Sequence, residues 1–209
     1  HALDWMIETL MAAEDREITI CPVGPLTNIG MALVREPRIA AKIAEIVTMG
    51  GGYFVGGNTT PAAEFNVYVD PHAADIVYRS GIPIVAMPLD VTHRALMSDE
   101  WIASIAAIGS EVGRKAAQML SFYERFDLER YGDKGGPVHD PATVAYLLDP
   151  GLYRGKEVYV EIETQSELTM GMTVVDYWGT RGNEPNCTWV TWVDAAGFFE
   201  LIRKRLATL

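Results

Sequence analysis

The sequence predicts an α/β fold with an open, mostly parallel sheet and flanking helices. Three observations lead to this prediction. Short apolar runs alternate with helical patterns along the first half of the chain, which is the order of strand–helix–strand units. The apolar run 45–49 stops at three glycines, Gly50 to Gly52, and a polar loop follows. Open α/β sheets bind their ligands at such carboxyl ends of strands. In the last third, the pattern changes to alternating strands.

The expected elements follow one another with short connections. Proline and glycine mark most of their ends. The first half predicts strands at residues 17–21, 45–49 and 83–87, and helices at 3–11, 26–33, 38–44 and 70–79. Residues 88–93 are expected to be a loop, and residues 98–128 a helical region broken near Gly109. The remainder predicts helices at 142–148 and 195–206, and strands at 157–164, 169–175 and 187–193. Asp70 and Asp194 are expected to cap the helices that follow them.

The composition is that of an ordinary globular protein with one domain, residues 1–209. A net charge of −11 argues against a nucleic-acid polymer or an anionic membrane surface as partner. Two cysteines are too few for a disulfide framework, and no apolar run has the length of a membrane span. The cytoplasm is therefore the expected location. The chain opens with His1 inside a helical pattern, so we expect it to begin partway through a longer protein.

Glu64 and Asn66 are the first candidates for a binding site. They lie on either side of Phe65, and residues two apart in an extended chain point the same way. Both side chains could then contact one ligand, which the glycines at 50–52 would allow to approach closely. The alternative is that both are solvated loop residues, since most loops are polar and exposed.

His139 and Asp140 precede a helix that begins with proline. A carboxylate there can cap the helix or bind a cation, and the imidazole can act as acid or base near neutral pH. The alternative is a simple N-cap beside a surface histidine. The turn at Val23, between two prolines, could direct its backbone carbonyl at a hard cation. Phe65 and Tyr131 could stack on a flat ligand or pack in the core. The chain contains neither a P-loop nor a GxGxxG fingerprint.

Taken together, these motifs resemble the inosine–uridine-type nucleoside hydrolases. The matching blocks follow the family's order along the whole chain: residues 22–29, 49–52 with Asn58, 63–71, 89–93, 138–141 and 168–176. Glu-Phe-Asn at 64–66 and His-Asp-Pro at 139–141 are the most specific blocks. The resemblance implies an open α/β sheet, Ca²⁺ as cofactor and a homo-oligomer, a dimer or a tetramer. It also implies hydrolysis of the N-glycosidic bond of ribonucleosides to ribose and a free base.

The resemblance also implies a role for each matching residue. The expected ribose-binding residues are Asn58, Glu64 and Asn66, with Met49 beneath the sugar. The expected base contacts are Phe65 and Tyr131. His139 would protonate the departing base, while the Asp140 carboxylate and the Val23 carbonyl would bind Ca²⁺. These types of residue suit the reaction, which builds oxocarbenium character on the sugar and needs a protonated leaving group.

One departure from the family is as informative as the match. The family's D-x-D-x-x-x-D-D loop, which follows its first strand, is absent here. Calcium takes about six to eight oxygen ligands, so one carboxylate and one carbonyl are not enough. The resemblance therefore implies the C-terminal two-thirds of a nucleoside hydrolase, with its first strands missing, inactive without that N-terminal segment. A non-catalytic nucleoside- or ribose-binding module and a structural fragment are the alternatives.

Overall fold

The computed structural model describes the backbone of residues 1–131 and 135–209, and side chains outside 123–134. The chain forms two compact units. The first consists of residues His1–Asp90 and Gly155–Thr191, and the second of Val91–Arg154 and Trp192–Leu209. One domain spanning residues 1–209 stays a prediction.

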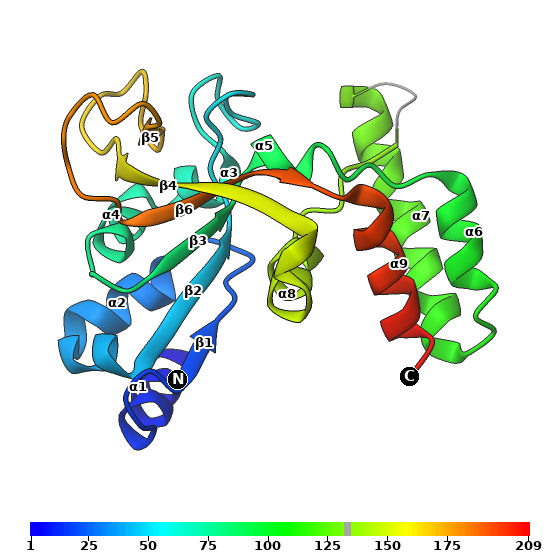
Figure 1. Ribbon diagram of the computed structural model, residues 1–209, viewed down its shortest axis with the longest axis horizontal. Coiled ribbons are helices and arrows are strands. Elements are labelled where there is room, and N and C mark those ends of the chain that lie inside the picture. The colour runs from blue at the N-terminus through cyan, green and yellow to red at the C-terminus, as the bar shows by residue number, and fades with distance from the viewer. Residues whose placement is uncertain (132–134) are drawn as a thin grey trace. The chain divides into compact units, whose positions relative to one another are not determined.

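A six-stranded sheet confirms the predicted α/β class, with the strand order β1-β2-β3-β6-β4-β5 (Figure 1). Its strands are β1 (Ile18–Ile20), β2 (Ile43–Met49), β3 (Ile84–Met87), β4 (Tyr153–Ile162), β5 (Thr173–Asp176) and β6 (Cys187–Val193). The pairs β1–β2, β2–β3 and β3–β6 are parallel, and β4–β5 is antiparallel. The sheet is therefore mostly parallel, as the strand–helix–strand order predicts.

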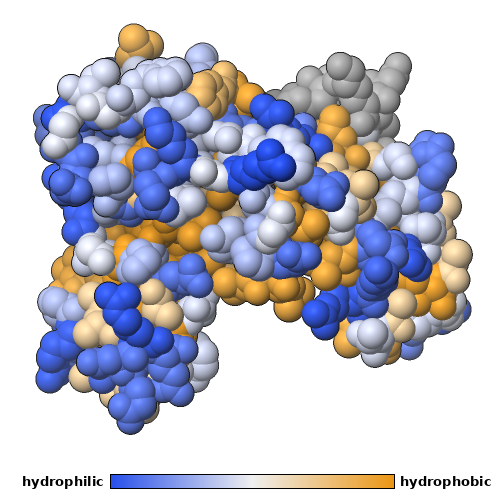
Figure 2. Space-filling model, in the orientation of Figure 1, coloured by the Kyte–Doolittle hydropathy of each residue, from blue (hydrophilic) through white to orange (hydrophobic). Residues whose placement is uncertain are grey.

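The helices of the first unit pack on one another and on the sheet. They are α1 (Ala2–Ala12), α2 (Thr27–Arg35), the 3₁₀ helix η1 (Pro37–Lys42), α3 (Phe65–Val69) and α4 (Pro71–Tyr78). Asp70 caps α4 as predicted, because its side chain accepts from the Ala73 amide at 3.0 Å. Hydrophilic residues cover the outer side of the α1 region, at lower left in Figure 2.

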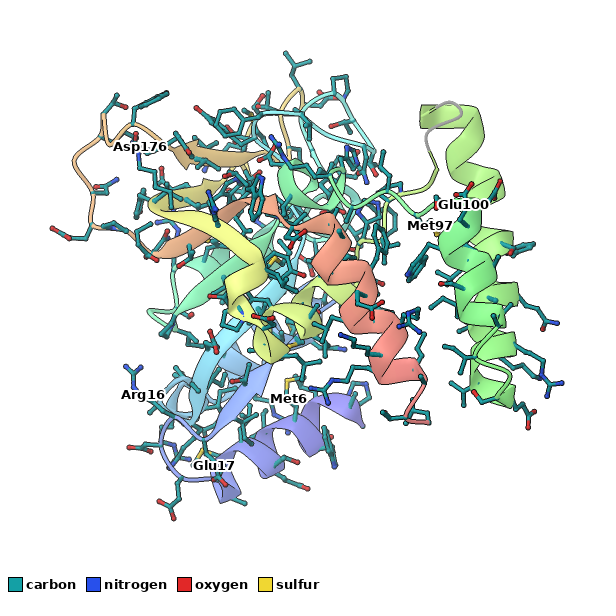
Figure 3. All side chains as sticks on the ribbon, turned by 45° about the vertical axis from the view of Figure 1, so that its right-hand side comes forward. Met6, Arg16, Glu17, Met97, Glu100 and Asp176 are labelled. Atoms are coloured by element: carbon teal, nitrogen blue, oxygen red, sulfur yellow. The ribbon has the colours of Figure 1, made fainter. Side chains whose placement is uncertain are left out.

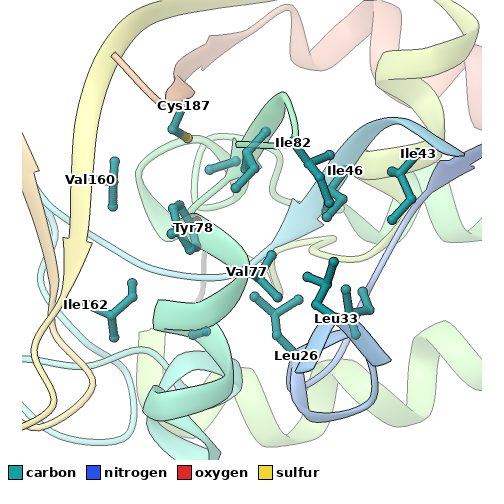
Figure 4. Packing of buried hydrophobic residues seen from close by; sticks show 14 of the residues in the cluster. Leu26, Leu33, Ile43, Ile46, Val77, Tyr78, Ile82, Val160, Ile162 and Cys187 are labelled. Atoms are coloured by element: carbon teal, nitrogen blue, oxygen red, sulfur yellow. The ribbon is translucent and has the colours of Figure 1, made fainter. Parts of the chain in front are cut away.

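Apolar side chains from these helices and from the strands form one core (Figure 4). Leu33 of α2, Ile46 of β2 and Val77 of α4 are all buried within it. Each such side chain contributes about 1.5–3 kcal/mol when it leaves water. The helices α2 and α4 approach closely at Gly30, where a Cβ atom would lie 2.9 Å from the Ala73 Cβ. Glycine is therefore required there by close packing between two helices.

The second unit is mainly helical. Its elements include α6 (Asp99–Ala106), α7 (Glu111–Tyr131), α8 (Pro141–Leu148), the 3₁₀ helix η2 (Pro150–Leu152) and α9 (Ala195–Leu206). The break between α6 and α7 contains Gly109 with φ +80°, as the sequence predicts. Trp101 joins α6 to α9, since its ring packs on Phe199 and its Nε1 donates to the Phe199 carbonyl at 3.1 Å. Across the described part of the chain, no helix has the length and apolar character needed to cross a membrane.

The expected loop at residues 88–93 is instead partly helical. Residues Leu89–Thr92 form the short helix α5. The prediction was wrong because Asp90 points inward and is only 4% exposed. A polar stretch of sequence is usually an exposed loop, which is why a loop was expected here. Instead, the Asp90 side chain is buried and accepts hydrogen bonds from the backbone amides of Phe54 and Val55.

Candidate functional site

The glycine turn after β2 is built around close contacts. Gly51 has φ +84°, and a Cβ added there would lie 2.9 Å from both Thr173 Cγ2 and Trp189 Cη2. Its amide donates to Glu64 Oε2 at 3.0 Å. Gly52 exchanges two hydrogen bonds with the Thr173 hydroxyl, at 3.1 and 2.8 Å. The turn is therefore a fixed structure rather than a flexible connection.

Glu64 caps a helix, which corrects the extended geometry expected for residues 64–66. Its carboxylate accepts from the Asn66 amide at 3.0 Å and the Val67 amide at 3.4 Å, at the start of α3. Glu64 is 3% exposed and Asn66 is 8% exposed. The alternation of an extended chain therefore does not operate here, because a capping carboxylate starts a helix at Phe65. Burial of both side chains also excludes the alternative of two solvated loop residues.

The other predicted residues of the first unit surround this cap. The Asn66 amide Nδ2 donates to the Met49 carbonyl at 3.1 Å and lies 3.4 Å from the Met49 Sδ atom. Asn58 Oδ1 accepts from the Phe65 amide at 2.9 Å, and the Phe65 ring is 52% exposed. The Met49 amide bonds to the carbonyl of the residue before Val23 at 3.0 Å. The structure thus brings together five of the predicted positions: Met49, Asn58, Glu64, Phe65 and Asn66.

The second unit contains His139 and Asp140. The His139 Nδ1 atom lies 2.7 Å from the Thr92 hydroxyl, and the His93 ring is 5.7 Å away between centroids. Burial, assisted by His93, lowers the pKa of His139 to about 4. The side chain of Tyr131, predicted to contact the base, falls outside the described residues.

Asp140 takes the N-cap position of α8 without capping it. Its backbone is helical, with φ −66° and ψ −41°, and its side chain makes no capping hydrogen bond. Its backbone carbonyl instead accepts from the Thr143 hydroxyl at 2.9 Å. Partial burial raises the pKa of the Asp140 carboxyl. The structure therefore does not support the simple N-cap, and cation binding by Asp140 stays a prediction.

A complete calcium site does not fit the described residues. Among them, no three His, Cys, Asp or Glu side chains gather around one point. Val23 lies in the first unit and Asp140 in the second. Calcium takes about six to eight oxygens, so a carbonyl and a carboxylate fall well short of the number needed.

Asp90 is a structural residue that the sequence analysis did not single out. Its carboxylate accepts from the amides of Phe54 and Val55 at 2.8 and 3.0 Å, from Tyr53 at 3.1 Å, and from Trp189 Nε1 at 2.8 Å. It thereby holds the segment that follows the glycine turn. The available signal was a carboxylate directly after an apolar strand, inside one of the matching blocks.

Known proteins resemble this chain along its length. It is 46% identical over 208 residues to the pyrimidine-specific ribonucleoside hydrolase RihA of Shewanella sp. (strain ANA-3), covering 99% of this chain and 65% of that protein. RihA of Escherichia coli O1:K1 / APEC is 46% identical over 206 residues, covering 98% of this chain and 66% of that protein. The chain thus spans about two-thirds of the length of these relatives.

Solved structures of nucleoside hydrolases also resemble this chain over its whole length. The plant nucleoside hydrolase PpNRh1 superposes with a TM-score of 0.90 at 29% identity, covering 100% of this chain and 67% of that one. The purine-preferring ribonucleoside hydrolase from Gardnerella vaginalis has a TM-score of 0.89 at 29% identity, with 99% and 65% covered. The family profile described as inosine-uridine preferring nucleoside hydrolase matches residues 1–200. The chain therefore belongs to the inosine-uridine preferring nucleoside hydrolase family.

Proposed function

We propose that the complete protein hydrolyses the N-glycosidic bond of ribonucleosides, and that this chain provides its ribose-binding residues and its proton donor. The observation that carries the proposal is the buried network of Glu64, Asn66 and Met49 at the carboxyl end of β2, in a chain of this family. Buried carboxylates are rare unless they are paired. A fold that keeps one at the mouth of its sheet provides a fixed acceptor for hydroxyl groups.

The fixed positions of Glu64 and Asn66 suit the proposed reaction. Breaking the glycosidic bond builds positive charge on the ribose ring. Acceptors that are already held in place stabilise such charge without reorganising during the reaction. Glu64 is held by three backbone amides and Asn66 by the Met49 carbonyl. We assign Glu64, Asn66 and Asn58 to the ribose hydroxyls and Met49 to the pocket beneath the ring.

His139 is the proposed acid for the departing base. With a pKa of about 4, its ring is neutral at pH 7 in this chain. A carboxylate within about 4–6 Å of the ring would favour its charged form. We therefore expect the acid function only in the complete protein, and we propose that acidic residues from an upstream segment supply this carboxylate.

Asp140 is the side-chain calcium ligand that we assign to this chain, and the Val23 carbonyl is a second proposed ligand. The remaining ligands are proposed to come from the upstream segment. The names of the relatives favour one substrate class. The RihA relatives at 46% identity are named pyrimidine-specific, whereas the purine-preferring structure is 29% identical. Pyrimidine ribonucleosides are therefore the first substrates to test, with Phe65 and Tyr131 as base contacts.

The proposal extends to the setting of the enzyme. We expect a homo-oligomer, and the net charge of −11 disfavours nucleic-acid polymers as partners. Cys21 and Cys187 are both free, as is usual in a reducing compartment, and we place the protein in the cytoplasm.

Release of reducing sugar from uridine, cytidine and inosine tests the proposal. We expect the complete protein to cleave at least one of them when Ca²⁺ is added, and this chain alone to cleave none. Asp140→Ala should lose calcium binding, measured by calorimetry, together with activity. His139→Ala should lower turnover about a hundredfold, most strongly for poor leaving groups.

Asp149→Ala is the matched control, since Asp149 caps η2 at the other end of α8 through the Gly151 amide. It should leave calcium binding and turnover unchanged. Unaltered kinetics in both the Asp140 and His139 variants would reject their assigned roles. Equilibrium binding of a nucleoside by a complete protein that shows no turnover would support the binding-module alternative instead. If the complete protein shows neither turnover nor nucleoside binding, the alternative of a structural fragment would be supported.

A further inference from the structure

The contact between Thr92 and His139 fixes which imidazole nitrogen is available. The hydroxyl of Thr92 lies 2.7 Å from His139 Nδ1, and Thr92 is 1% exposed. A threonine hydroxyl can donate or accept a hydrogen bond. Nδ1 is therefore occupied in either tautomer, and Nε2 is the nitrogen left to exchange a proton with another molecule.

We infer that Thr92 is a positioning residue for His139, holding Nδ1 so that Nε2 exchanges the proton with the leaving base. Thr92 itself touches neither the substrate nor the reacting atoms in this account. The inference rests on the proposed function, because it concerns the acid of that reaction.

The backbone around the pair supports positioning rather than chance contact. The segments 95–97 and 136–138 run antiparallel, with a bridge between Leu96 and Pro137. The Val138 amide donates to the Ala95 carbonyl at 3.0 Å, and the Met97 amide to the Gly136 carbonyl at 3.0 Å. Met97, labelled in Figure 3, lies on the first of these segments. The ladder ends at Val138, which precedes His139, and at Ala95, whose amide donates to the Thr92 carbonyl at 3.1 Å. Backbone hydrogen bonds thus connect the two residues without involving their side chains.

The neighbouring glycine shows how closely the two segments approach. A Cβ atom at Gly135 would lie 1.9 Å from the Met97 carbonyl oxygen, and Gly135 has φ +82°. On the other side of His139, its carbonyl accepts from the Ala142 amide at 3.2 Å. The main chain of His139 is thus fixed on both sides. The two side-chain torsions of His139 remain, and the hydrogen bond to the Thr92 hydroxyl restricts them.

The test compares Thr92→Val, which keeps the shape and removes the hydroxyl, with Thr92→Ser, which keeps the hydroxyl. Both are made in the complete protein and assayed with uridine and with 4-nitrophenyl β-D-riboside, whose leaving group departs as a stable anion without a proton. We expect Thr92→Val to lower kcat for uridine about tenfold or more, since general acid catalysis is worth about 10² to 10⁴. KM for uridine and turnover of the nitrophenyl riboside should stay near wild type. Thr92→Ser should restore most of the uridine activity.

Nitrogen NMR of this chain gives a readout that does not depend on activity. The chain has four histidines, and the His139 signals are those lost in His139→Gln. We expect the His139 Nδ1 signal to be that of a hydrogen-bonded nitrogen in the wild type and in Thr92→Ser, and to shift in Thr92→Val. Thr48→Val is the control for removing a buried hydroxyl, because Thr48 is 3% exposed and, among the described residues, its hydroxyl reaches the Met49 carbonyl alone, at 3.5 Å.

The outcomes separate the inference from the proposed function. Equal loss on both substrates in Thr92→Val, or no loss on either, would overturn positioning even though the enzyme is active. An unchanged His139 Nδ1 signal in Thr92→Val would overturn it as well. A complete wild-type protein that cleaves the nitrophenyl riboside and no nucleoside would contradict the acid role of His139. A wild type that cleaves neither substrate would refute the proposed function, and the NMR result would still decide the Thr92–His139 contact.

Discussion

Asp90→Asn tests whether one buried carboxylate holds the loop behind the glycine turn. Each oxygen of Asp90 accepts from two strong donors. Oδ1 accepts from the amides of Phe54 and Val55 at 2.8 and 3.0 Å. Oδ2 accepts from Trp189 Nε1 at 2.8 Å and from the Tyr53 amide at 3.1 Å. In asparagine, either orientation of the amide turns its NH₂ group toward two donors.

The expected loss of stability follows from the number of donors that the asparagine NH₂ group would face. Hydrogen bonds to a charged acceptor contribute about 1.5–3 kcal/mol each, and a buried donor without an acceptor costs about as much. Two displaced donors therefore predict a decrease of about 3–6 kcal/mol in the free energy of unfolding of the first unit. Domains are typically stable by about 5–15 kcal/mol, so the variant should unfold at much lower urea concentration. Circular dichroism against urea measures the change, and hydrogen exchange at residues 53–55 should accelerate.

Asp176→Asn provides the matched control. Asp176, labelled in Figure 3, follows the same pattern on the surface, accepting from the Thr180 and Arg181 amides at 2.8 Å each. Those hydrogen bonds lower the pKa of the Asp176 carboxyl. Water can replace lost partners at this site, so the loss should be far smaller than for Asp90. The reasoning is refuted if Asp90→Asn lies within about 1 kcal/mol of wild type, or if both substitutions destabilise equally.

Two further substitutions test particular contacts. Gly51→Ala should destabilise the chain by about 2 kcal/mol or more, because its φ is strained and the added Cβ would press on the Thr173 methyl group. Gly24→Ala is the control, since a Cβ there has nothing within 4 Å. The urea midpoint should fall for Gly51→Ala and change little for Gly24→Ala. Tyr153→Phe should be neutral or stabilising by about 1 kcal/mol at pH 7, because the buried Tyr153 hydroxyl has no hydrogen-bond partner among the described residues. Burial, then Asp149, raises the pKa of Tyr153, so the unfolded chain loses the phenol proton first, and wild-type stability falls as the pH rises above about 10. The melting temperature of Tyr153→Phe should therefore exceed that of wild type by more at pH 10.5 than at pH 7, while a constant difference would contradict this; Tyr159→Phe, whose hydroxyl reaches Glu161 at 3.5 Å, is the control.

The sequence predicted the fold well because its signals are local and repeated. The predicted strand at 45–49 lies within β2, and that at 83–87 nearly coincides with β3. Both are continuous apolar runs, as expected for strands that parallel neighbours and helices cover on both faces. The closing helix begins after Asp194, whose side chain accepts from the Gly197 amide at 3.2 Å. Such caps can be read from sequence because the side chain and its backbone partner lie three residues apart.

The local geometry around Glu64 and Asn66 was not predicted. Glu64 and Asn66 were expected to face one ligand from an extended chain, yet Glu64 starts a helix and Asn66 lies inside it. The partner that decides this is the Gly51 amide, thirteen residues away, which draws the Glu64 carboxylate inward. A short segment cannot show that its side chain will be paired at such a distance. The backbone that presents these residues depended on the tertiary contact, and their roles in binding stay a prediction.

The same limit explains why Asp90 and Thr92 were overlooked. Both lie on α5, a helix of four residues, and neither is exposed. Asp90 belongs to the first unit, where it holds the segment after the glycine turn, and Thr92 belongs to the second, where it contacts His139. The type of a side chain is enough to identify candidates that could touch a substrate, such as a histidine beside an aspartate. Residues that orient those candidates carry ordinary side chains, and only their burial and partners reveal them. A motif of this family therefore combines two kinds of residue, and the positioning kind becomes visible once the fold brings its partners together.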